Sequence, residues 1–366
     1  MSDGKNGFEK TKHNFPYKWT LKDAVFTKDK GKVFSCFACG GGSTMGYKLA
    51  GFDVIGHNDI DKKMIEVYKE NHNPKFSFLE SITTFAKRKD LPKELYNLDI
   101  LDGSPPCSSF SMAGNREKDW GKEKVFREGQ AEQVLDTLFF DFIDLAKELQ
   151  PKVVVAENVK GLLMGEAKAY VRKIYTEFDK AGYYCQHFLL DASKMGVPQR
   201  RERVFFICLR KDLAKPFLHY ADMFTEIPEI EMVFNETEIP YKDIECGNKA
   251  NPMYTIPPAC IPYWSQTKPG DSFSKVHPKG HFFQCYKADP NKCLPTFTPH
   301  DKNRQGVFHY EQLRTVTQKE IKLISSFPQD YKESPLNISY LCGMSVPPIM
   351  TAQIAKQVYE QWLSKI

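Results

Sequence analysis

A short apolar run at residues 33–38 breaks directly into a glycine-rich turn, and this junction restricts the folds open to the chain. The turn holds Gly40, Gly41, Gly42 and Gly46. Glycine allows a tight turn and lets a ligand approach the backbone closely. A helix-compatible stretch follows, and then a second apolar run at 52–56 that leads to Asp59. The order of strand, glycine turn, helix and strand predicts a βαβ unit.

The alternation of strand and helix patterns continues to about residue 211. Further strands are predicted at 98–101, 153–156, 183–190 and 203–209, and helices at 61–71, 132–150 and 167–181. This alternation predicts an α/β fold with a doubly wound parallel sheet. Residues 212–312 are rich in Pro, Tyr, Phe, Asn and Lys and lack a long periodic helix, which indicates a second, smaller and irregular domain. Helical patterns return at 317–326 and 348–364.

The composition narrows the classes of protein that the chain can belong to. It contains no run of 18 apolar residues and its first 15 residues lack an apolar core, so we expect no membrane span, no signal peptide and a cytoplasmic location. Thiols stay reduced in that compartment, so the ten cysteines predict no disulfides. Cys36 and Cys39 form a CxxC without a second half-site, so no metal is predicted. The net charge of +5 is compatible with a nucleic-acid partner.

Three of the predicted strands end in residues that suit chemistry, and ligands of open α/β sheets bind at such strand ends. Asp59 follows the second strand, Pro106-Cys107 follows the strand at 98–101, and Glu157-Asn158 follows the strand at 153–156. Simpler explanations exist for each. A glycine turn can form without a ligand, a lone cysteine is more often a buried bystander, and a Glu-Asn pair can cap a helix.

Two charged segments belong to the same part of the chain. Residues 116–128 are too densely charged for a core, so they form either a solvated loop or a lid that closes over the nucleophile. Arg201 and Arg203 lie two apart at the start of a predicted strand, which places both on one face. Surface charge is the default interpretation, but two guanidinium groups on one face also suit recognition of phosphate or carbonyl oxygens.

The order of these clusters resembles the DNA (cytosine-5) methyltransferase family over about residues 32–364. The glycine turn is similar to the cofactor motif of that family, GSPPCSSFS around Cys107 to its Pro-Cys motif, Glu157-Asn158-Val159 to its ENV motif, and Gln199-Arg200-Arg201-Glu202-Arg203 to its QxRxR motif. Arg314, Thr317, Glu320 and Phe327-Pro328 resemble the penultimate motif, and Gly343-Met344-Ser345-Val346 the last.

The resemblance implies a domain organisation and two ligands. Residues 1–211 would form a Rossmann-like catalytic domain that binds S-adenosylmethionine, with an arm at 1–31. Residues 212–312 would form the target-recognition domain, and 313–366 would return to the catalytic domain. Double-stranded DNA would be the partner, and we expect a monomer. The implied cofactor-binding residues are Phe37, Ala38, Gly40, Gly41, Gly42, Asp59 on the ribose, Ile60 against the adenine, Ser81, Ile82, Ser345 and Val346.

The resemblance also implies roles in catalysis. The Cys107 thiolate, in a turn stiffened by Pro106, would attack C6 of a flipped cytosine. Glu157 would be protonated, or share a proton, and would hydrogen-bond N3 and the exocyclic amine of the base. Arg203 would bind O2, with Arg201 supporting the site. Asn158 would hold the catalytic turn in shape.

Three positions depart from the pattern of the family. Cys39 stands where the family usually has glycine, and Met344 where it usually has asparagine. Ser81 aligns with an acidic residue of the family, although Glu80 is adjacent. All three lie on the cofactor side, so we predict altered cofactor affinity rather than loss of activity.

Two other functions remain open. One is an RNA cytosine methyltransferase on the same scaffold, which the insert at 212–312 disfavours because a reader of base edges needs such a module. The other is a catalytically silent DNA-binding protein, which the intact catalytic residues disfavour. Aromatic and basic residues of the insert could contact nucleic acid or could equally be core or solvated surface: Tyr254, Trp264, Lys268, Lys279 and Arg304.

Overall fold

The chain divides into two compact units that are each discontinuous in sequence. The computed structural model describes residues 13–106, 137–165, 167–220, 226–246, 255–299 and 306–366, together with two short strands, β5 (Glu123–Lys124) and β6 (Gln133–Val134), that pair antiparallel. The sheet unit comprises Val25–Asp191, Glu202–Val233 and Ile354–Ile366. The irregular unit comprises Met1–Ala24, Ala192–Arg201 and Phe234–Gln353. The predicted boundaries after residues 211 and 312 stay predictions.

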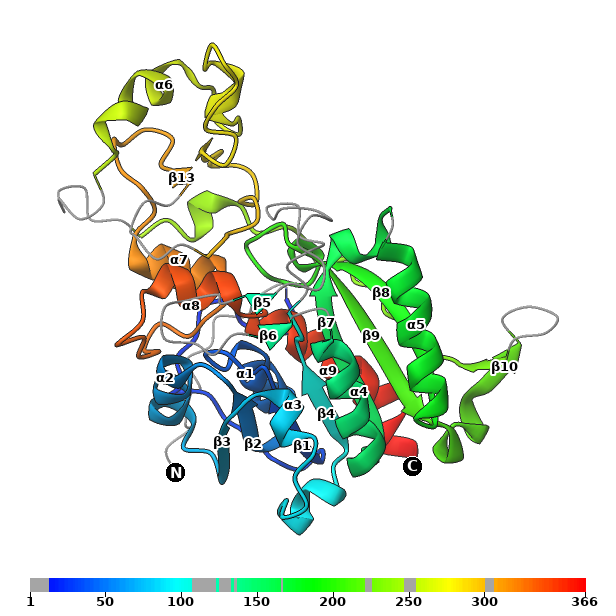
Figure 1. Cartoon of the computed structure of the whole chain (residues 1–366). Helices are drawn as coiled ribbons and strands as arrows, with labels where there is room; N and C mark the ends of the chain where they lie inside the picture. The colour runs from blue at the N-terminus through cyan, green and yellow to red at the C-terminus, as the bar shows by residue number, and fades with distance from the viewer. Residues whose placement is uncertain are drawn as a thin grey trace, which may run out of the picture. The chain divides into compact units, whose positions relative to one another are not determined.

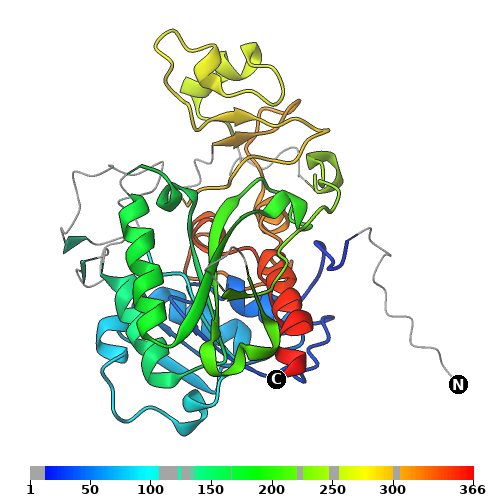
Figure 2. The ribbon, with the colours of Figure 1, turned by 90° about the vertical axis from the view of Figure 1, so that its right-hand side faces the viewer.

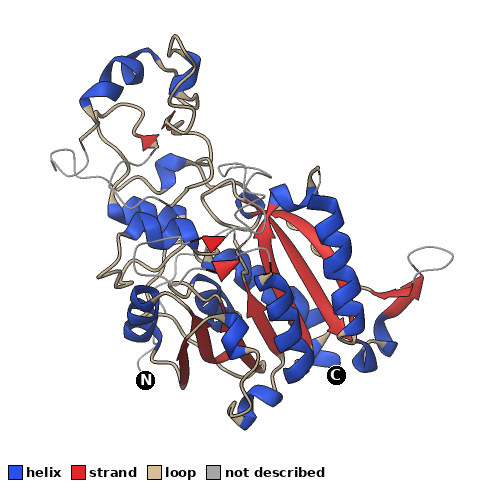
Figure 3. Ribbon diagram, in the orientation of Figure 1, coloured by secondary structure: helices blue, strands red, loops and turns tan. Residues whose placement is uncertain are grey.

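The sheet unit is built on a seven-stranded sheet with the order β3-β2-β1-β4-β7-β9-β8 (Figures 1 and 3). The strands are β1 (Lys32–Cys36), β2 (Asp53–Asp59), β3 (Phe76–Leu79), β4 (Ile100–Gly103), β7 (Val153–Val159), β8 (Tyr183–Asp191) and β9 (Glu202–Arg210). The five strands from β3 to β7 are parallel, whereas β9 pairs antiparallel with both β7 and β8. The α/β fold is therefore confirmed, and the expectation of an all-parallel sheet is wrong at β9. No crossover helix separates β8 from β9, and a parallel pair needs such a crossover.

Helices cover the sheet on both faces. They are α1 (Gly42–Leu49), α2 (Lys62–His72), α3 (Ile82–Phe85), α4 (Leu138–Leu149), α5 (Ala167–Lys180) and α9 (Pro348–Gln361), of which the residues from Ile354 belong to this unit. Figure 1 shows α3, α4 and α5 on one face of the sheet, and the turned view in Figure 2 shows α9 on the other. Ligand-binding edges of doubly wound sheets lie at the strand ends between such layers.

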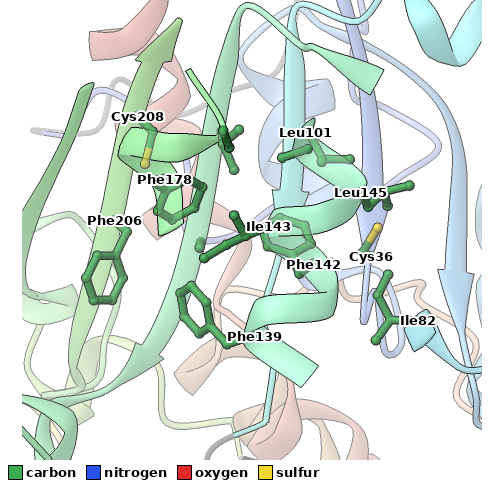
Figure 4. Packing of buried hydrophobic residues seen from close by; sticks show 14 of the residues in the cluster. Cys36, Ile82, Leu101, Phe139, Phe142, Ile143, Leu145, Phe178, Phe206 and Cys208 are labelled. Atoms are coloured by element: carbon green, nitrogen blue, oxygen red, sulfur yellow. The ribbon is translucent and has the colours of Figure 1, made fainter. Parts of the chain in front are cut away.

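The main apolar core lies between the sheet and the layer of α3, α4 and α5. Phe139 of α4 contacts Phe178 of α5 and Phe206 of β9 there, and Phe142 of α4 lies in the same core (Figure 4). Strand β1 is buried on both faces. Phe34 and Cys36 point into this core, and the alternate residues Val33 and Ser35 are buried on the opposite face. This explains the continuous apolar run from which the sequence predicted the strand.

The irregular unit contains only short regular elements among its described residues. They are α6 (Ile261–Gln266), β12 (Tyr286–Lys287), β13 (Val307–Phe308), α7 (Gln318–Ile324) and α8 (Ile338–Met344). Helix α7 begins with a capping box in which Thr317 accepts from the backbone of Glu320, which agrees with the predicted start at residue 317. The hairpin of β10 (Leu218–Tyr220) and β11 (Glu226–Pro228) belongs to the sheet unit.

Short 3₁₀ helices complete the described parts of both units. They occupy Lys93–Tyr96, Lys160–Leu163, Ala192–Lys194, Lys211–Leu213, Lys215–Phe217, Tyr241–Asp243, Pro258–Cys260, Phe273–Lys275 and Leu363–Lys365. In the portions of the chain that the structure describes, none of the helices combines the length and apolar character needed to cross a lipid bilayer.

Candidate active site

The loop between β1 and α1 is a tight turn that requires a left-handed backbone at several positions. Phe37, Cys39 and Gly41 have φ angles of 51°, 47° and 80°. A Cβ atom on Gly41 would lie 2.4 Å from Nε2 of His72, so only glycine fits there. The backbone N–H of Gly41 closes the turn by donating to the carbonyl of Ala38 over 2.8 Å. At Cys39 the same conformation gives a physical reason for the glycine that the resembled family usually carries.

Asp59 ties this loop to the end of β2. Its Oδ2 accepts the backbone N–H of Cys39 and its Oδ1 accepts that of Asp61, each over 2.8 Å. The side chain is almost fully buried, and this burial raises the pKa of Asp59 to about 6. Ile60, the predicted adenine contact, follows directly and is half-buried. The structure therefore brings Asp59 and the predicted cofactor loop together within the sheet unit.

The end of β3 lies next to Asp59, but its side chains are already engaged. The backbone N–H of Glu80 donates to the carbonyl of Asp59 over 3.1 Å, and Glu80 Oε1 lies 2.8 Å from Nη1 of Arg88. Ser81 caps α3 by accepting the backbone N–H of Thr84. The side chain of Ile82 is packed in the core shown in Figure 4. The cofactor contacts of Ser81 and Ile82 stay predictions.

Asn158 fixes the turn that precedes the predicted nucleophile. Its Nδ2 donates to the carbonyl of Pro105 over 3.1 Å, and the residue is 3% exposed. This bond joins the end of β7 to the chain that leaves the neighbouring strand β4. Pro106 is half-buried. Cys107 and the charged segment at 116–128, apart from β5, lie outside the described residues.

Glu157 and Arg203 form an ion pair at the edge where β7 meets β9. Arg203 Nε lies 3.0 Å from Glu157 Oε1, and their side chains are only 16% and 13% exposed. Burial lowers the pKa of Arg203 because it disfavours the charged guanidinium, while the charge of Glu157 and its hydrogen bond act in the opposite direction. Arg203 Nη1 also donates to the carbonyl of Glu202 over 2.8 Å. The two side chains that the resemblance assigns to base recognition are thus held together.

Arg201 and the last predicted cofactor residues belong to the irregular unit. Arg201 precedes β9, and its guanidinium donates to the carbonyls of Phe297 and Gly343 over 3.2 and 3.1 Å. Ser345 donates to the carbonyl of Leu341 over 2.8 Å, and Val346 is buried. The supporting role of Arg201 and the cofactor contacts of Ser345 and Val346 therefore stay predictions.

The sequence analysis missed a buried polar cluster at the base of the glycine loop. Asp102 of β4 accepts hydrogen bonds from Ser35, Ser43 and Tyr47. A sequence signal for it exists, because a carboxylate stands at the end of the apolar run ILD, and Ser43 and Tyr47 lie four residues apart on one helix.

The candidates in the irregular unit separate into structural and exposed residues. Trp264 Nε1 donates to the carbonyl of His309 over 2.7 Å, and the Lys287 ammonium lies 4.1 Å from the centre of its ring, so Trp264 is structural. Lys268 and Lys279 are exposed. Tyr254 and Arg304 lie outside the described residues. Within the described ranges no group of three or more His, Cys, Asp or Glu side chains is placed to hold a metal ion.

Comparisons with known proteins place the chain among DNA methylases. The model of the C-5 cytosine-specific DNA methylase family matches residues 31–360. The Type II methyltransferase M.FnuDI of Fusobacterium nucleatum is 37% identical over 182 residues, which is 50% of this chain and 48% of the relative. The Type II methyltransferase M.NgoPII of Neisseria gonorrhoeae is 27% identical over 355 residues, which is 89% of this chain and 95% of the relative.

Solved structures of similar proteins agree on the fold. A putative DNA modification methyltransferase encoded within a prophage of E. coli matches with a TM-score of 0.63 at 20% identity, covering 90% of this chain and 99% of that one. The DNMT2 of Spodoptera frugiperda matches with a TM-score of 0.61 at 18% identity, with the same coverage of 90% and 99%. At these identities the matches show the Rossmann-like methyltransferase fold alone.

Proposed function

The chain belongs to the family of C-5 cytosine-specific DNA methylases, so its class of reaction is DNA cytosine-5 methylation, and we propose that it transfers a methyl group from S-adenosylmethionine to C5 of a cytosine flipped out of duplex DNA. The observation that carries the mechanistic part of this proposal is the buried pair of Glu157 and Arg203 beside the turn that Asn158 holds.

The loop residues fit a methyl donor of this kind. Gly41 has a left-handed φ of 80° and no room for a side chain, so the tight turn of the loop requires glycine at this position. Asp59 uses one lone pair of each oxygen on backbone N–H groups, which leaves acceptor capacity for a pair of ribose hydroxyls. When bound, S-adenosylmethionine supplies an electrophilic methyl group. Phe37, Ala38, Gly40 and Gly42 would hold it through the backbone and the Phe37 ring.

Cys107 is proposed as the nucleophile because it occupies the position of the Pro-Cys motif of the family. C5 of cytosine is a weak nucleophile, and addition of a thiolate to C6 breaks the aromaticity and makes C5 electron-rich. C5 then takes the methyl group, the C5 proton is removed, and the thiolate is eliminated. Pro106 and the bond from Asn158 to the Pro105 carbonyl support a stiff turn at this point.

Glu157 and Arg203 are proposed to bind the base and spread the charge that develops on it. The contact of Arg203 with Oε1 orients the Glu157 carboxyl toward the base. The carboxyl would carry or share a proton there, so that it donates to N3 and accepts from the exocyclic amine. Arg203 would meet O2 of the base with its remaining donors. Because both side chains are mostly buried, their interaction with a charged ring is stronger than it would be in water.

Residues 212–312 are proposed as the target-recognition domain, and double-stranded DNA as the substrate. Among the described residues of this segment, the helices and strands are short and are joined by loops, which suits reading of base edges. The exposed Lys268 and Lys279 are available for backbone phosphates. The alternative of RNA as the substrate is an outcome of the test that follows.

The test is methyl transfer from tritiated S-adenosylmethionine to mixed-sequence duplex DNA and, separately, to tRNA. We expect label in 5-methylcytosine of DNA, and none with Cys107→Ala. The matched control is Cys246→Ala, because Cys246 is an exposed cysteine in the other unit and should leave the rate unchanged.

Each outcome decides one part of the proposal. Label in RNA alone would contradict the DNA substrate and favour the RNA enzyme. Equal rates for Cys107→Ala and the wild-type chain would contradict the nucleophile. A covalent adduct with DNA that contains 5-fluorocytosine would exclude a silent DNA-binding protein, because only the attacked base can trap the thiolate.

A further inference from the structure

Asp102 is a buried carboxylate that the mechanism above does not use. Its Oδ2 accepts the hydroxyls of Ser35 and Ser43, each over 2.7 Å, and its Oδ1 accepts the hydroxyl of Tyr47 over 3.1 Å. Asp102 is 5% exposed, and none of the three donors is more than 7% exposed. A carboxylate in such a place costs free energy unless several donors compensate it.

The three donors come from the two elements that form the glycine loop. Ser35 lies on β1 directly opposite Asp102 of β4 in the parallel register. Ser43 stands in the first turn of α1, and Tyr47 one turn later on the same face. One carboxylate therefore joins β1, β4 and the first two turns of α1.

The position of this cluster links both halves of the proposed site. β1 and α1 flank the loop at Phe37 and Gly41, and β4 ends at Gly103, directly before the turn that leads to the nucleophile. An apolar side chain at position 102 could fill the same space between the strands and α1, but it would form no hydrogen bonds. The hydroxyl bonds add a directional constraint, because each fixes an angle as well as a distance.

Burial has a measurable effect on Asp102. It raises the pKa of Asp102 to about 6, against the three hydroxyl bonds that lower it, and the charge of Glu157 on the next strand raises it further. The hydroxyl bonds therefore offset only part of the free energy that it costs to bury the ionised Asp102 carboxylate. Such a cost is often carried by residues with a role beyond packing.

We propose that Asp102 is a positioning residue that sets the glycine loop relative to the end of β4, so that the methyl donor binds tightly and in line with the base. The proposal rests on the proposed function, because it assigns the loop to S-adenosylmethionine. Asp102 touches neither the donor nor the base and acts through Ser43, Tyr47 and Ser35.

The test compares Tyr47→Phe, Ser43→Ala and Asp102→Asn with the wild-type chain in equilibrium binding of S-adenosylmethionine without DNA. We expect binding weaker by about tenfold for Asp102→Asn and by about threefold for each hydroxyl variant, from the loss of two or more bonds and of one bond respectively. In steady-state assays the KM for S-adenosylmethionine should rise in the same order, while the KM for DNA stays within about twofold.

Tyr68→Phe is the matched control. Tyr68 of α2 is also fully buried, but its hydroxyl forms a hydrogen bond of 2.8 Å with Thr44 of α1 instead of with Asp102. A structural role alone would lower the thermal stability of Tyr47→Phe and Tyr68→Phe alike and leave the KM for S-adenosylmethionine unmoved. The proposal requires that only Tyr47→Phe shifts that KM.

Three outcomes would overturn the proposal. They are unchanged binding in Tyr47→Phe and Ser43→Ala, an equal loss of binding in Tyr68→Phe, and a parallel rise in the KM for DNA. If Asp102→Asn does not fold, the two hydroxyl variants still decide. A wild-type chain that binds S-adenosylmethionine and methylates cytosine, with hydroxyl variants like wild type, would refute this inference and leave the proposed function intact. A wild-type chain that does neither would refute both.

Discussion

The sheet unit and the irregular unit are stabilised in different ways. The sheet unit has a large apolar core to which several strands and three helices contribute. The irregular unit has a small apolar cluster of Ile256, Cys260, Phe273 and Phe308. Close to it, a buried ion pair of Arg314 and Glu320 collects several polar contacts. The comparison teaches that the sheet unit is built on one large apolar core, whereas the irregular unit combines buried apolar side chains, such as Ile324, Phe327 and Leu341, with a buried polar network.

Glu320 is the centre of that polar network. Its two oxygens accept both terminal nitrogens of Arg314, over 3.0 and 2.8 Å, the hydroxyl of Tyr241 over 3.0 Å, and the backbone N–H of Thr317 over 2.6 Å. The side chain is fully buried. A buried charge with so many donors is expensive to remove, since its partners then remain unpaired.

The largest expected effect is therefore that of Glu320→Ala. It should lower the free energy of unfolding of the irregular unit by about 3–5 kcal/mol, because it leaves the buried Arg314 charge without its ion-pair partner. Hydrogen exchange read by mass spectrometry should lose protection in α7 and at Tyr241 but keep it in β1, β4 and β7. The control is the exposed Glu311→Ala, which should stay within about 0.5 kcal/mol of wild type. Equal loss of protection in β1 and α7 would mean that the two units do not differ in the way proposed.

The second prediction tests the apolar core of the sheet unit. Phe142→Leu should lower the free energy of unfolding by roughly 1.5 kcal/mol, through lost apolar contact and an imperfect fit. Phe142 also lies against Gly103, where a Cβ atom would come within 2.6 Å of its ring, and its ring centre is 6.4 Å from that of Phe37. Binding of S-adenosylmethionine should therefore weaken as well, as measured by calorimetry.

Phe178→Leu is the control for that prediction. Phe178 is buried in the same core but contacts Phe139 and Tyr183 instead of the loop. It should cost a similar free energy of unfolding and leave binding unchanged. Weaker binding in both variants would mean that binding follows overall stability, and that the core does not support the loop in particular.

The strength of each sequence pattern explains what could be predicted. The helix predicted at 167–181 is α5, Ala167–Lys180, because its apolar residues repeat at the helical period over many turns. Strand β3 was not among the predicted elements, since it has only four residues, none of them buried. The reversed direction of β9 left no mark on the sequence, because a strand buried on both faces has the same apolar run in either direction.

The same limit applies to the site. Asp59, Glu157 and Asn158 could be proposed because each follows an apolar run at a strand end. Asp102 also ends such a run, but its meaning depends on hydroxyls from two other elements that only the fold brings together. The partners of Arg201 are carbonyls about 100 or more residues away, and no local pattern indicates them.

The third prediction concerns pH and the loop of the sheet unit. Binding of S-adenosylmethionine should weaken by about tenfold between pH 7 and pH 5, because the pKa of Asp59 is raised to about 6 and only the ionised carboxylate accepts from both ribose hydroxyls. The effect of Asp59 on stability has the opposite sign, so it does not explain weaker binding of S-adenosylmethionine at pH 5. The folded chain holds this proton more tightly than the unfolded chain, so Asp59 adds to the free energy of unfolding as the pH falls from about 7 to 4.

Calorimetric titration over this range checks the prediction, with Asp59→Asn as the comparison. The variant should bind weakly at both pH values and lose the dependence on pH. A variant that keeps the tenfold change would assign it to another group, of which Asp102 is the first candidate, since burial also raises its pKa to about 6.

The smallest expected effect is at Cys39, where the sheet unit itself departs from regular geometry. Cys39 has a φ of 47°, a left-handed conformation that costs a residue with a Cβ atom about 1 kcal/mol. Cys39→Gly should raise the free energy of unfolding by about 0.5 kcal/mol, after the larger entropy of glycine in the unfolded chain is subtracted. It should also change the affinity for S-adenosylmethionine, because the Cys39 N–H is held by Asp59. Cys39→Ala keeps the Cβ atom and removes the thiol, so it should give no gain in stability. An equal gain in the free energy of unfolding in both variants would assign the effect to loss of the thiol. The left-handed backbone at Cys39 would then not be a source of strain in the sheet unit.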